Sequence, residues 1–381
     1  MRPQPKPGAA ADPLAAYTLD TLLAGAARLR PQGLALRDAD GASLTFAALH
    51  GHATRLAARL KQTGLEPGET LLVLGGNRIS SLIALMAGVC AGLDVAMLSP
   101  GLRADRLAML ANRTRAAVLV CGEPFGGVDL LDKGFMAAAL TETVRLVGTL
   151  GSGNADAVDF SAGALAGDIA PVLPAPAHLS DILTLTPDGM TRHSQRKLVA
   201  GTLDLIARAR FRAAQPLLAT LGPSTYAGLA SGLLAGLLCG ASVTLHGIFD
   251  AARLLAQLED MPQAQLVVPA ELLPALARAG ILQHGPLAGL LAVSRWQTNA
   301  GDFAPPASLP NSVPLVDLHA FGEMALLAEA RGADGRARAL LEPPHDIEVG
   351  ADVICAVDAD NDTADGLRFF GAAVSVPEDV T

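Results

Sequence analysis

The sequence predicts an α/β protein made of two stacked α/β subdomains with mainly parallel sheets, plus a small β-unit at the C-terminal end. Short apolar segments alternate with segments of helical periodicity along most of the chain. Of the 381 residues, 51% are apolar and 17% are charged, so the chain can bury a large core. This length corresponds to roughly two or three units if a domain takes about 150 residues.

The first part of the chain has a β-α-β-α-β pattern. An amphipathic helix is expected over 19–29, and the alternating runs around Asp40-Gly41 predict a hairpin. Helical spacing of apolar residues predicts a helix over 46–63 that ends at Gly64. The other expected elements are strands within 65–77, 94–100 and 116–122 and helices over 79–92 and 104–114. A parallel sheet covered by helices follows from this order.

The second part repeats the alternation. Residues 123–177 are rich in Gly, Ala and Pro and are interpreted as a boundary region. After it we expect strands at 182–186, 217–221, 242–246, 265–269 and 287–293, helices over 198–212, 251–258 and 270–279, and a glycine-rich helix. Short strands with turns begin at Asp346. The expected domains are a flexible tail (1–16), a first α/β subdomain (17–177), a second (178–345) and a small β-unit (346–381).

Charge and cysteine usage exclude several classes of protein. A net charge of −9 argues against binding to a nucleic-acid backbone. The four cysteines lie far apart and have no zinc spacing, so no metal site is expected. The Pro-rich start lacks the apolar core of a signal peptide, which favours a cytoplasmic protein.

One segment leaves a membrane alternative open. Residues 213–249 contain no Lys, Arg, Asp or Glu, and within them Gly228, Gly232, Gly236 and Gly240 recur at every fourth position. On a helix these glycines form one stripe, as in membrane helix pairs. The β-branched segment ASVTLHGIF follows at once, which favours a buried helix-to-strand crossover in a soluble core.

No common catalytic motif is present. The chain lacks GxxxxGK[ST], GxGxxG, GxSxG and HExxH. The stretch LTLTPDGMTRHSQRK nevertheless resembles a rewritten phosphate-binding loop, because an apolar lead-in meets a turn containing Thr186, Gly189 and Thr191, with basic residues after it.

Several stretches in the same order resemble one family. SLTFAALHGHATRLAARLKQTGLEPGETLLVLGGN, ISSLIALMAGVCAGLDVAMLSP, GLASGLLAGLLCGASVTLHGIFD, AQLVVPAELLPAL and DGLRFFGAAV follow one another along the chain. From Tyr17 to Gly371 the sequence resembles the large N-terminal domain of AMP-forming adenylating enzymes: acyl-CoA synthetases, luciferases and peptide-synthetase adenylation domains. The resemblance implies ATP-dependent activation of a carboxylate, with release of pyrophosphate and transfer of the acyl group to a thiol.

The chain departs from this family at the loop that wraps the ATP phosphates. The family's Ser/Thr/Gly-rich loop ends in Pro-Lys and falls, without gaps, on Thr186 to Ser194. Thr186 matches, whereas Asp188 and Thr191 replace glycines and Ser194 replaces the lysine. A shifted alignment recruits Gly189 and Thr191, with a basic residue as the cation: Arg192, Arg196 or Lys197.

Two further motifs are altered. The family's "YGxTE" segment, whose Thr and Glu serve the phosphates and magnesium, falls on Phe321, Gly322, Glu323, Met324 and Ala325. The aromatic residue and the glycine match, and Glu323 lies two places early. The substrate-side histidine of "PxxHxxG" falls on Thr225, while Gly228 matches. The family's ribose-binding Asp and its C-terminal domain with the catalytic lysine have no counterpart before Thr381.

The leading interpretation is a degenerate adenylating-enzyme core, a pseudoenzyme that binds an acyl or aryl ligand or serves as a partner subunit. One alternative is an active carboxylate–AMP ligase that uses ATP, AMP and magnesium and is completed by a C-terminal domain from another chain. The other is the membrane-attached protein. The candidate nucleotide-binding residues are Thr186, Gly189, Thr191, Arg192, Phe321, Gly322 and Glu323, and the candidate substrate-pocket residues are Thr225 and Gly228.

Overall fold

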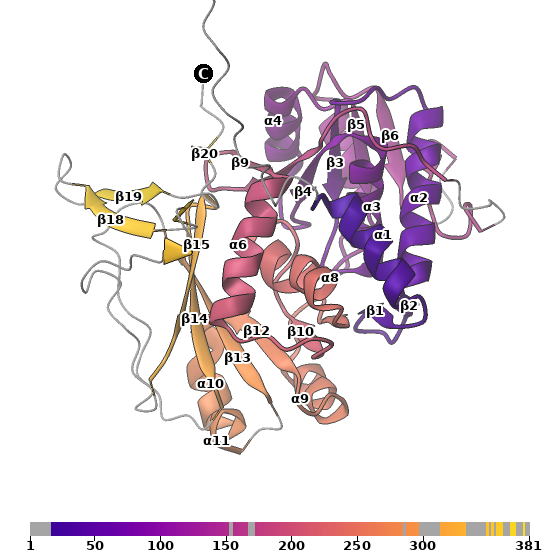
Figure 1. Cartoon of the computed structure of the whole chain (residues 1–381). Helices are drawn as coiled ribbons and strands as arrows, with labels where there is room; N and C mark the ends of the chain where they lie inside the picture. The colour runs from indigo at the N-terminus through magenta and orange to yellow at the C-terminus, as the bar shows by residue number, and fades with distance from the viewer. Residues whose placement is uncertain are drawn as a thin grey trace, which may run out of the picture.

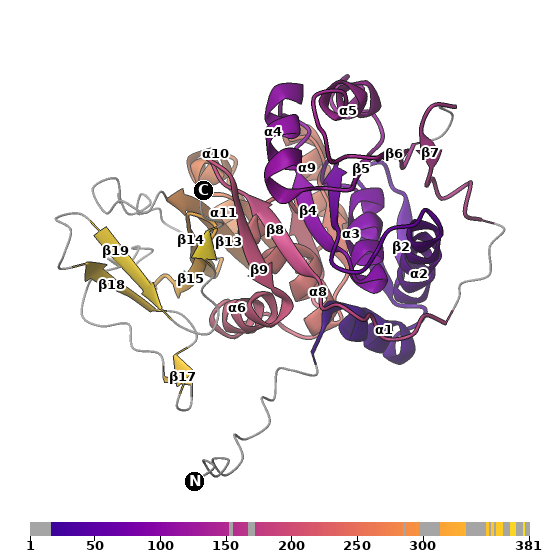
Figure 2. The same cartoon turned by 90° about the horizontal axis from the view of Figure 1, so that it is seen from above.

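The structure is a computed structural model. It describes residues 17–151, 155–166, 172–284, 287–296 and 313–332, and the backbone of five short strands beyond them. Two eight-stranded sheets lie side by side with helices between and around them (Figures 1 and 2). The α/β class with two mainly parallel sheets is therefore confirmed.

The first sheet has the strand order β20-β9-β8-β4-β3-β5-β6-β7. Its central strands are parallel and fully buried, as expected for a sheet covered on both faces. Strand β9 is antiparallel to both of its neighbours, β8 and β20. The strands are β3 (Thr70–Leu74), β4 (Asp94–Leu98), β5 (Val118–Cys121), β6 (Leu146–Thr149), β7 (Val158–Asp159), β8 (Asp181–Leu185), β9 (Met190–Ser194) and β20 (Val376–Pro377).

The second sheet has the order β15-β14-β13-β12-β10-β11-β1-β2. Pairing is parallel from β1 to β14, and the outer strands β2 and β15 are antiparallel. The strands are β1 (Leu34–Arg37), β2 (Ser43–Thr45), β10 (Leu217–Ala219), β11 (Val243–Leu245), β12 (Gln265–Pro269), β13 (Gly289–Trp296), β14 (Leu315–Phe321) and β15 (Ala325–Ala330).

The two sheets exchange strands across the expected boundary at residue 177. Strand β1, from the start of the chain, pairs with β11 in the second sheet, and β2 pairs with β1 at the edge of that sheet. Strands β8 and β9, which follow the boundary, join β4 in the first sheet. Backbone hydrogen bonding therefore divides the chain differently from the ranges 17–177 and 178–345.

The helices agree closely with the periodicity of the sequence. Apolar residues at helical spacing turn inward, and Gly92 ends α3 in the left-handed conformation that glycine favours, with φ +78°. The helices are α1 (Leu19–Leu29), α2 (Phe46–Gln62), α3 (Ile79–Ala91), α4 (Ala104–Thr114), α5 (Leu130–Ala138), α6 (Gln195–Arg208), α7 (Tyr226–Leu229), η1 (Ala230–Leu234), α8 (Ala235–Cys239), α9 (Ala251–Asp260), η2 (Ala270–Leu272), α10 (Leu273–Arg278) and α11 (Ile281–His284).

The glycine-striped segment forms one buried helical stretch from α7 to α8 with a π-helical turn, η1, in its middle. Gly236 lies against Val243, where an added Cβ would come within 2.5 Å of a methyl group. Within the described residues, no helix is long and apolar enough to cross a membrane. The stripe instead packs the helix against the second sheet.

Two segments differ from expectation. The interpreted boundary region, 123–177, contains α5, β6 and β7, because Leu146–Thr149 extends the parallel first sheet beyond β5. The residues after the predicted phosphate turn form strand β9, which the sequence did not predict. In the expected β-unit, the described segments are β16 (Glu348–Val349), β17 (Asp352–Val353), β18 (Ala356–Asp360), β19 (Gly366–Phe370) and β20.

Candidate functional site

A cleft of about 390 Å³ lies where the turn after β8 faces the turn between β14 and β15. It brings Thr186 together with Gly322 and Glu323, which lie far from it in the sequence. It also lies at the carboxyl ends of parallel strands, where ligands of open α/β sheets bind. Its lining consists of Leu185, Thr186, Pro187, Arg295, Trp296, Ala320, Gly322 and Glu323.

The turn between β8 and β9 contains only residues 186–189. It closes on itself, because the N–H of Thr186 donates to the Gly189 carbonyl (3.0 Å) and the N–H of Gly189 donates to the Thr186 Oγ1 (2.8 Å). Pro187 has no N–H. Within the described residues, Asp188 alone in this turn keeps an N–H without a partner, and its own carboxylate would repel phosphate.

Two arginines of α4 hold the turn from outside. Arg106 donates to the Pro187 carbonyl at 2.7 Å, and Arg113 donates to the Asp188 carbonyl at 2.7 Å. Both contacts use backbone oxygens of the turn. The turn is therefore anchored to the first subdomain by its carbonyl groups.

The rest of the predicted loop lies in strand β9. Thr191 is fully buried, and its hydroxyl has no hydrogen-bond partner within the described part of the chain. His193 is equally buried, contacts the ring of Tyr226 and shares a 2.8 Å hydrogen bond with the Thr184 hydroxyl. Burial lowers the pKa of His193 to about 3. Thr191 therefore does not line the cleft with Thr186.

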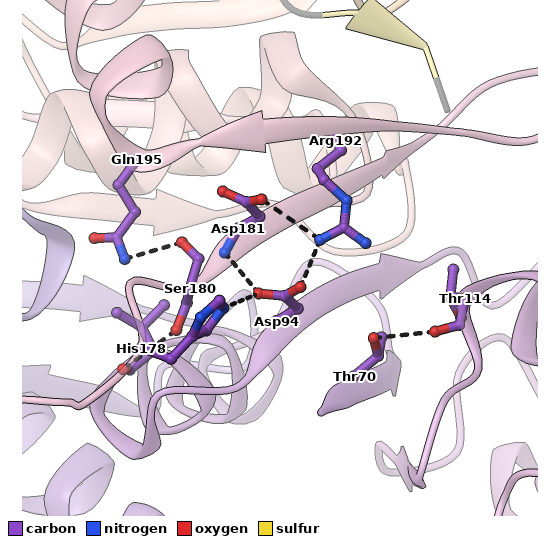
Figure 3. A network of polar contacts seen from close by, with 9 residues as sticks. Thr70, Asp94, Thr114, His178, Ser180, Asp181, Arg192 and Gln195 are labelled. Carbon is purple, nitrogen blue, oxygen red and sulfur yellow. Dashed lines mark hydrogen bonds and ion pairs between the residues drawn. The ribbon is translucent and has the colours of Figure 1, made fainter. Parts of the chain in front are cut away.

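Arg192 points away from the cleft, toward the amino ends of β4 and β8 (Figure 3). Its guanidinium lies 2.5 Å from the Asp94 carboxylate and 3.5 Å from that of Asp181. Asp94 also accepts hydrogen bonds from the Asp181 N–H (2.9 Å) and is paired with the His178 ring (2.8 Å). Burial, followed by the nearby Asp94 charge, raises the pKa of Asp181. This network ties the segment before β8 to the first sheet.

The other two basic candidates lie in the first turn of α6. Arg196 is exposed, and Lys197 donates its backbone N–H to the Ser194 hydroxyl, which caps the helix. Neither residue belongs to the cleft lining.

Glu323 lies on the cleft wall with its carboxylate engaged inside the protein. One oxygen accepts the backbone N–H of Tyr226, at the start of α7, and the other pairs with Arg295 at 2.9 Å. The side chain is 5% exposed, and the residue has φ +62°, a conformation that costs a non-glycine residue about 1 kcal/mol. Gly322, at φ +50°, supplies the other half of this tight turn.

The remaining candidates have structural contacts. Phe321 is fully buried at the end of β14. Thr225 caps α7 by accepting the N–H of Gly228 at 3.0 Å. A Cβ on Gly228 would come within 2.0 Å of the Gly222 carbonyl oxygen, so only glycine allows this backbone approach. Thr225 and Gly228 shape the second subdomain beside Glu323 and are absent from the cleft lining.

The sequence reasoning missed Arg295 and Trp296. They end strand β13, next to Phe321 in the neighbouring strand, and Arg295 is half exposed. The indole N–H of Trp296 donates to His319 at 3.0 Å. The strand predicted from the sequence ends at 293, whereas the strand in the structure continues to Trp296, so the prediction left both residues out of the site. Their place after a parallel strand was the signal that could have found them.

These residues do not fit a triphosphate with magnesium. The turn has little free amide to offer, and the Glu323 carboxylate is already bonded to Tyr226 and Arg295. Within the described residues, no group of three or more His, Cys, Asp or Glu side chains could hold a metal ion. The groups in the cleft wall that could bind a ligand are the half-exposed guanidinium of Arg295 and the indole ring of Trp296.

Comparison of sequences shows local similarity to enzymes of peptide and aryl-acid assembly. Phosphinothricin tripeptide synthetase PhsB of Streptomyces viridochromogenes is 38% identical over 105 residues, which cover 28% of this chain and 9% of that protein. Salicyl-AMP ligase / salicyl-S-ArCP synthetase of Mycobacterium tuberculosis is 37% identical over 116 residues, covering 29% and 20%. The chain thus matches only a small part of the length of either relative.

Solved structures share the fold over nearly the whole chain. The luciferase-like enzyme of Zophobas morio has a TM-score of 0.74 at 15% identity, covering 96% of this chain and 88% of that one. ATP-bound MatB of Rhodopseudomonas palustris has a TM-score of 0.69 at 18% identity, covering 93% and 71%.

The fold is therefore that of the N-terminal domain of adenylating enzymes, as the sequence resemblance predicted. A family model described as AMP-binding enzyme matches residues 23–291, which is more than half of the chain. This protein belongs to the AMP-binding enzyme family.

Proposed function

We propose that this protein is impaired in ATP-dependent carboxylate activation and binds an acyl or aryl carboxylate in the cleft, as a ligand-binding or partner subunit. The observation that carries the proposal is the engagement of Glu323: its carboxylate is bonded to the Tyr226 N–H and to Arg295. A carboxylate used in this way is not free to position magnesium.

The turn at 186–189 supports the first half of the proposal. A loop that wraps phosphates needs converging backbone N–H groups. Here the Thr186 and Gly189 amides are consumed within the turn, and Arg106 and Arg113 bind its carbonyls. Bringing these two amides to phosphate would require breaking the two hydrogen bonds they make, each worth about 0.5–1.5 kcal/mol.

The Arg295 side chain supports the second half. Its contact with Glu323 leaves a guanidinium with several further donors at the cleft, and the side chain is 54% exposed. Guanidinium groups recognise carboxylates by paired hydrogen bonds. Trp296, Leu185 and Ala320 supply apolar and aromatic walls, and about 390 Å³ suits a small organic acid.

Isothermal titration calorimetry on the intact chain tests both halves. Mg-ATP and AMP should give no saturable heat at millimolar concentration. A panel of benzoates and short acyl carboxylates should contain at least one saturable binder. Arg295→Gln should weaken that binder at least tenfold, whereas Arg278→Gln, an exposed arginine on α10, should leave it unchanged.

A different result would support another function. Micromolar binding of Mg-ATP, followed by pyrophosphate release with a carboxylic acid and an added C-terminal domain from a relative, would revive the ligase alternative. If neither nucleotide nor any carboxylate binds, the ligand-binding half fails and the cleft has no small-molecule role.

A further inference from the structure

A second and larger cavity lies between α1 and the end of α8. Its volume is about 570 Å³, which is within the range of ligand pockets. It is separate from the cleft, since the two share no lining residue. Figures 1 and 2 show α1 and α8 next to each other, and their backbones are in contact.

The walls of this groove are mainly apolar. Helix α1 contributes Leu22, Ala26 and Leu29, and the end of the glycine-striped helix contributes Leu237 and Leu238. Leu29 is 76% exposed, so this part of the apolar wall is open to a ligand. Helix α1 has 11 residues and spans about 16 Å, so the groove has the length of an extended acyl chain.

One end of the groove carries a positive charge. Arg30 follows α1, is exposed, and donates to the Gly240 carbonyl at 2.8 Å. Within the described residues, no carboxylate pairs with Arg30, although the chain as a whole has a net charge of −9. Its contact is to a neutral carbonyl, which uses one of the guanidinium donors and leaves the others available to a ligand.

We propose that this groove binds an amphipathic monoanion, a free fatty carboxylate, with the chain along α1 and the carboxylate at Arg30. Each part of such a ligand meets a suitable part of the groove. The apolar walls would bury the methylene groups, at about 0.8 kcal/mol each. Arg30, which has no acidic partner among the described residues, would bind the carboxylate by charge-assisted hydrogen bonds. This site is independent of the carboxylate site proposed at Arg295.

The test is calorimetric titration of the intact chain with octanoate, below its micelle concentration, against 1-octanol as the uncharged ligand of equal length. Octanoate should bind at least tenfold more tightly than 1-octanol. Arg30→Gln should lower the affinity for octanoate to the level of the affinity for 1-octanol. Because Arg30 also caps α8, a variant that leaves Arg30 in place is needed as well.

Gly25→Leu is that variant. A Cβ at Gly25 would meet no atom within 4 Å, and Gly25 lines the groove, so we expect a leucine side chain there to occupy part of it. It should lower octanoate affinity at least tenfold while the melting temperature stays the same or rises. Ala24→Leu, on the same helix but outside the groove lining, is the matched control and should bind like the unmodified chain.

Four outcomes would overturn the proposal. One is undiminished binding to Gly25→Leu, and another is equal affinity for octanoate and 1-octanol. The third is loss of octanoate binding in Arg295→Gln but not in Gly25→Leu, which would place the acid in the cleft. The fourth is octanoate binding only after removal of residues 1–16, which would identify the chain's own start as the occupant.

Discussion

At the scale of single residues, Glu323 connects two parts of the second subdomain. Its carboxylate accepts the Tyr226 N–H and pairs with Arg295, so it joins the β14–β15 turn to the start of α7. The sequence placed Glu323 in the candidate site on the basis of its neighbours Phe321 and Gly322. It could not indicate that the carboxylate turns inward, because that depends on α7, which is 97 residues away along the chain.

Replacing Glu323 by alanine should lower the free energy of unfolding by about 2 kcal/mol, because a buried N–H and a guanidinium both lose their acceptor. Glu323→Gly should cost about 1 kcal/mol less than Glu323→Ala, since glycine adopts a positive φ without strain. Urea denaturation measures both. Glu271→Ala, an exposed glutamate in η2, should stay within about 0.5 kcal/mol of the unmodified chain. An equal loss in the free energy of unfolding for all three variants would contradict the structural role of the Glu323 carboxylate.

A second prediction concerns pH. Burial raises the pKa of Asp38 to about 6 from 3.8, so folding gains stability from its protonated form below about pH 4 and loses it as pH rises to about 6. Burial lowers the pKa of His193 to about 3 and of His319 to about 4, both from 6.5. Between pH 6.5 and about 4 the unfolded chain therefore binds up to two more protons than the folded chain, so acid destabilises the fold through these histidines over that range.

Asp38 opposes the histidines between pH 4 and 6. Asp38→Asn should therefore raise the free energy of unfolding at pH 7, by at most about 3 kcal/mol for a shift of roughly two pKa units. Between pH 6 and 4.5 the variant should lose stability more steeply than the unmodified chain, because the opposing effect of Asp38 is gone. The asparagine side-chain oxygen can still accept the Ile79 N–H that Asp38 accepts at 2.9 Å. Urea midpoints at several pH values provide the check. Parallel curves for the two proteins would show that Asp38 titrates normally in the fold.

At the scale of elements, the glycines of the stripe differ in how much space surrounds them, which predicts a ranking of stability for their alanine variants. A Cβ at Gly228 meets a backbone oxygen at 2.0 Å, one at Gly236 meets a methyl group at 2.5 Å, and one at Gly232 meets nothing closer than 4.0 Å. Gly228→Ala should thus be the most destabilising, by more than about 2 kcal/mol, and Gly236→Ala intermediate. Gly232→Ala should be neutral or stabilising by up to about 1 kcal/mol, since alanine favours helix. Thermal unfolding ranks the three, and a larger loss at Gly232 than at Gly228 would contradict the packing.

The elements also show what the sequence could predict. Helices α1 to α4 and the buried parallel strands followed from periodicity, because one face or the whole segment is apolar. Strand β9 did not, because MTRHS alternates between a buried threonine and histidine on one face and Arg192 on the other. Apart from Met190 the segment is polar, so its burial depends on β8, β20 and Tyr226, which no local pattern reveals.

At the scale of the whole molecule, each of the two large sheets is built from strands on both sides of residue 177. The chain order predicted two successive subdomains, since alternating segments carry no information about which sheet a strand joins. In the structure β1 pairs with β11 across roughly 200 residues of sequence, β2 pairs with β1, and Asn77 donates from the first part of the chain to the Ala219 carbonyl at 2.9 Å. The two parts therefore stabilise each other.

The whole molecule should consequently unfold in one cooperative transition. Trp296, the single tryptophan, reports on the second sheet through its fluorescence, and the buried thiols of Cys90 and Cys121 report on the first through their reaction with a maleimide. Their urea midpoints should coincide, because the chain crosses between the two sheets and each sheet contains strands from both sides of residue 177. A fragment ending at residue 177 lacks β8, β9 and the partner strand of β1, so it should show neither a cooperative melt nor protected thiols. Separate midpoints, or a stably folded fragment, would mean that the two sheets fold independently despite their exchanged strands.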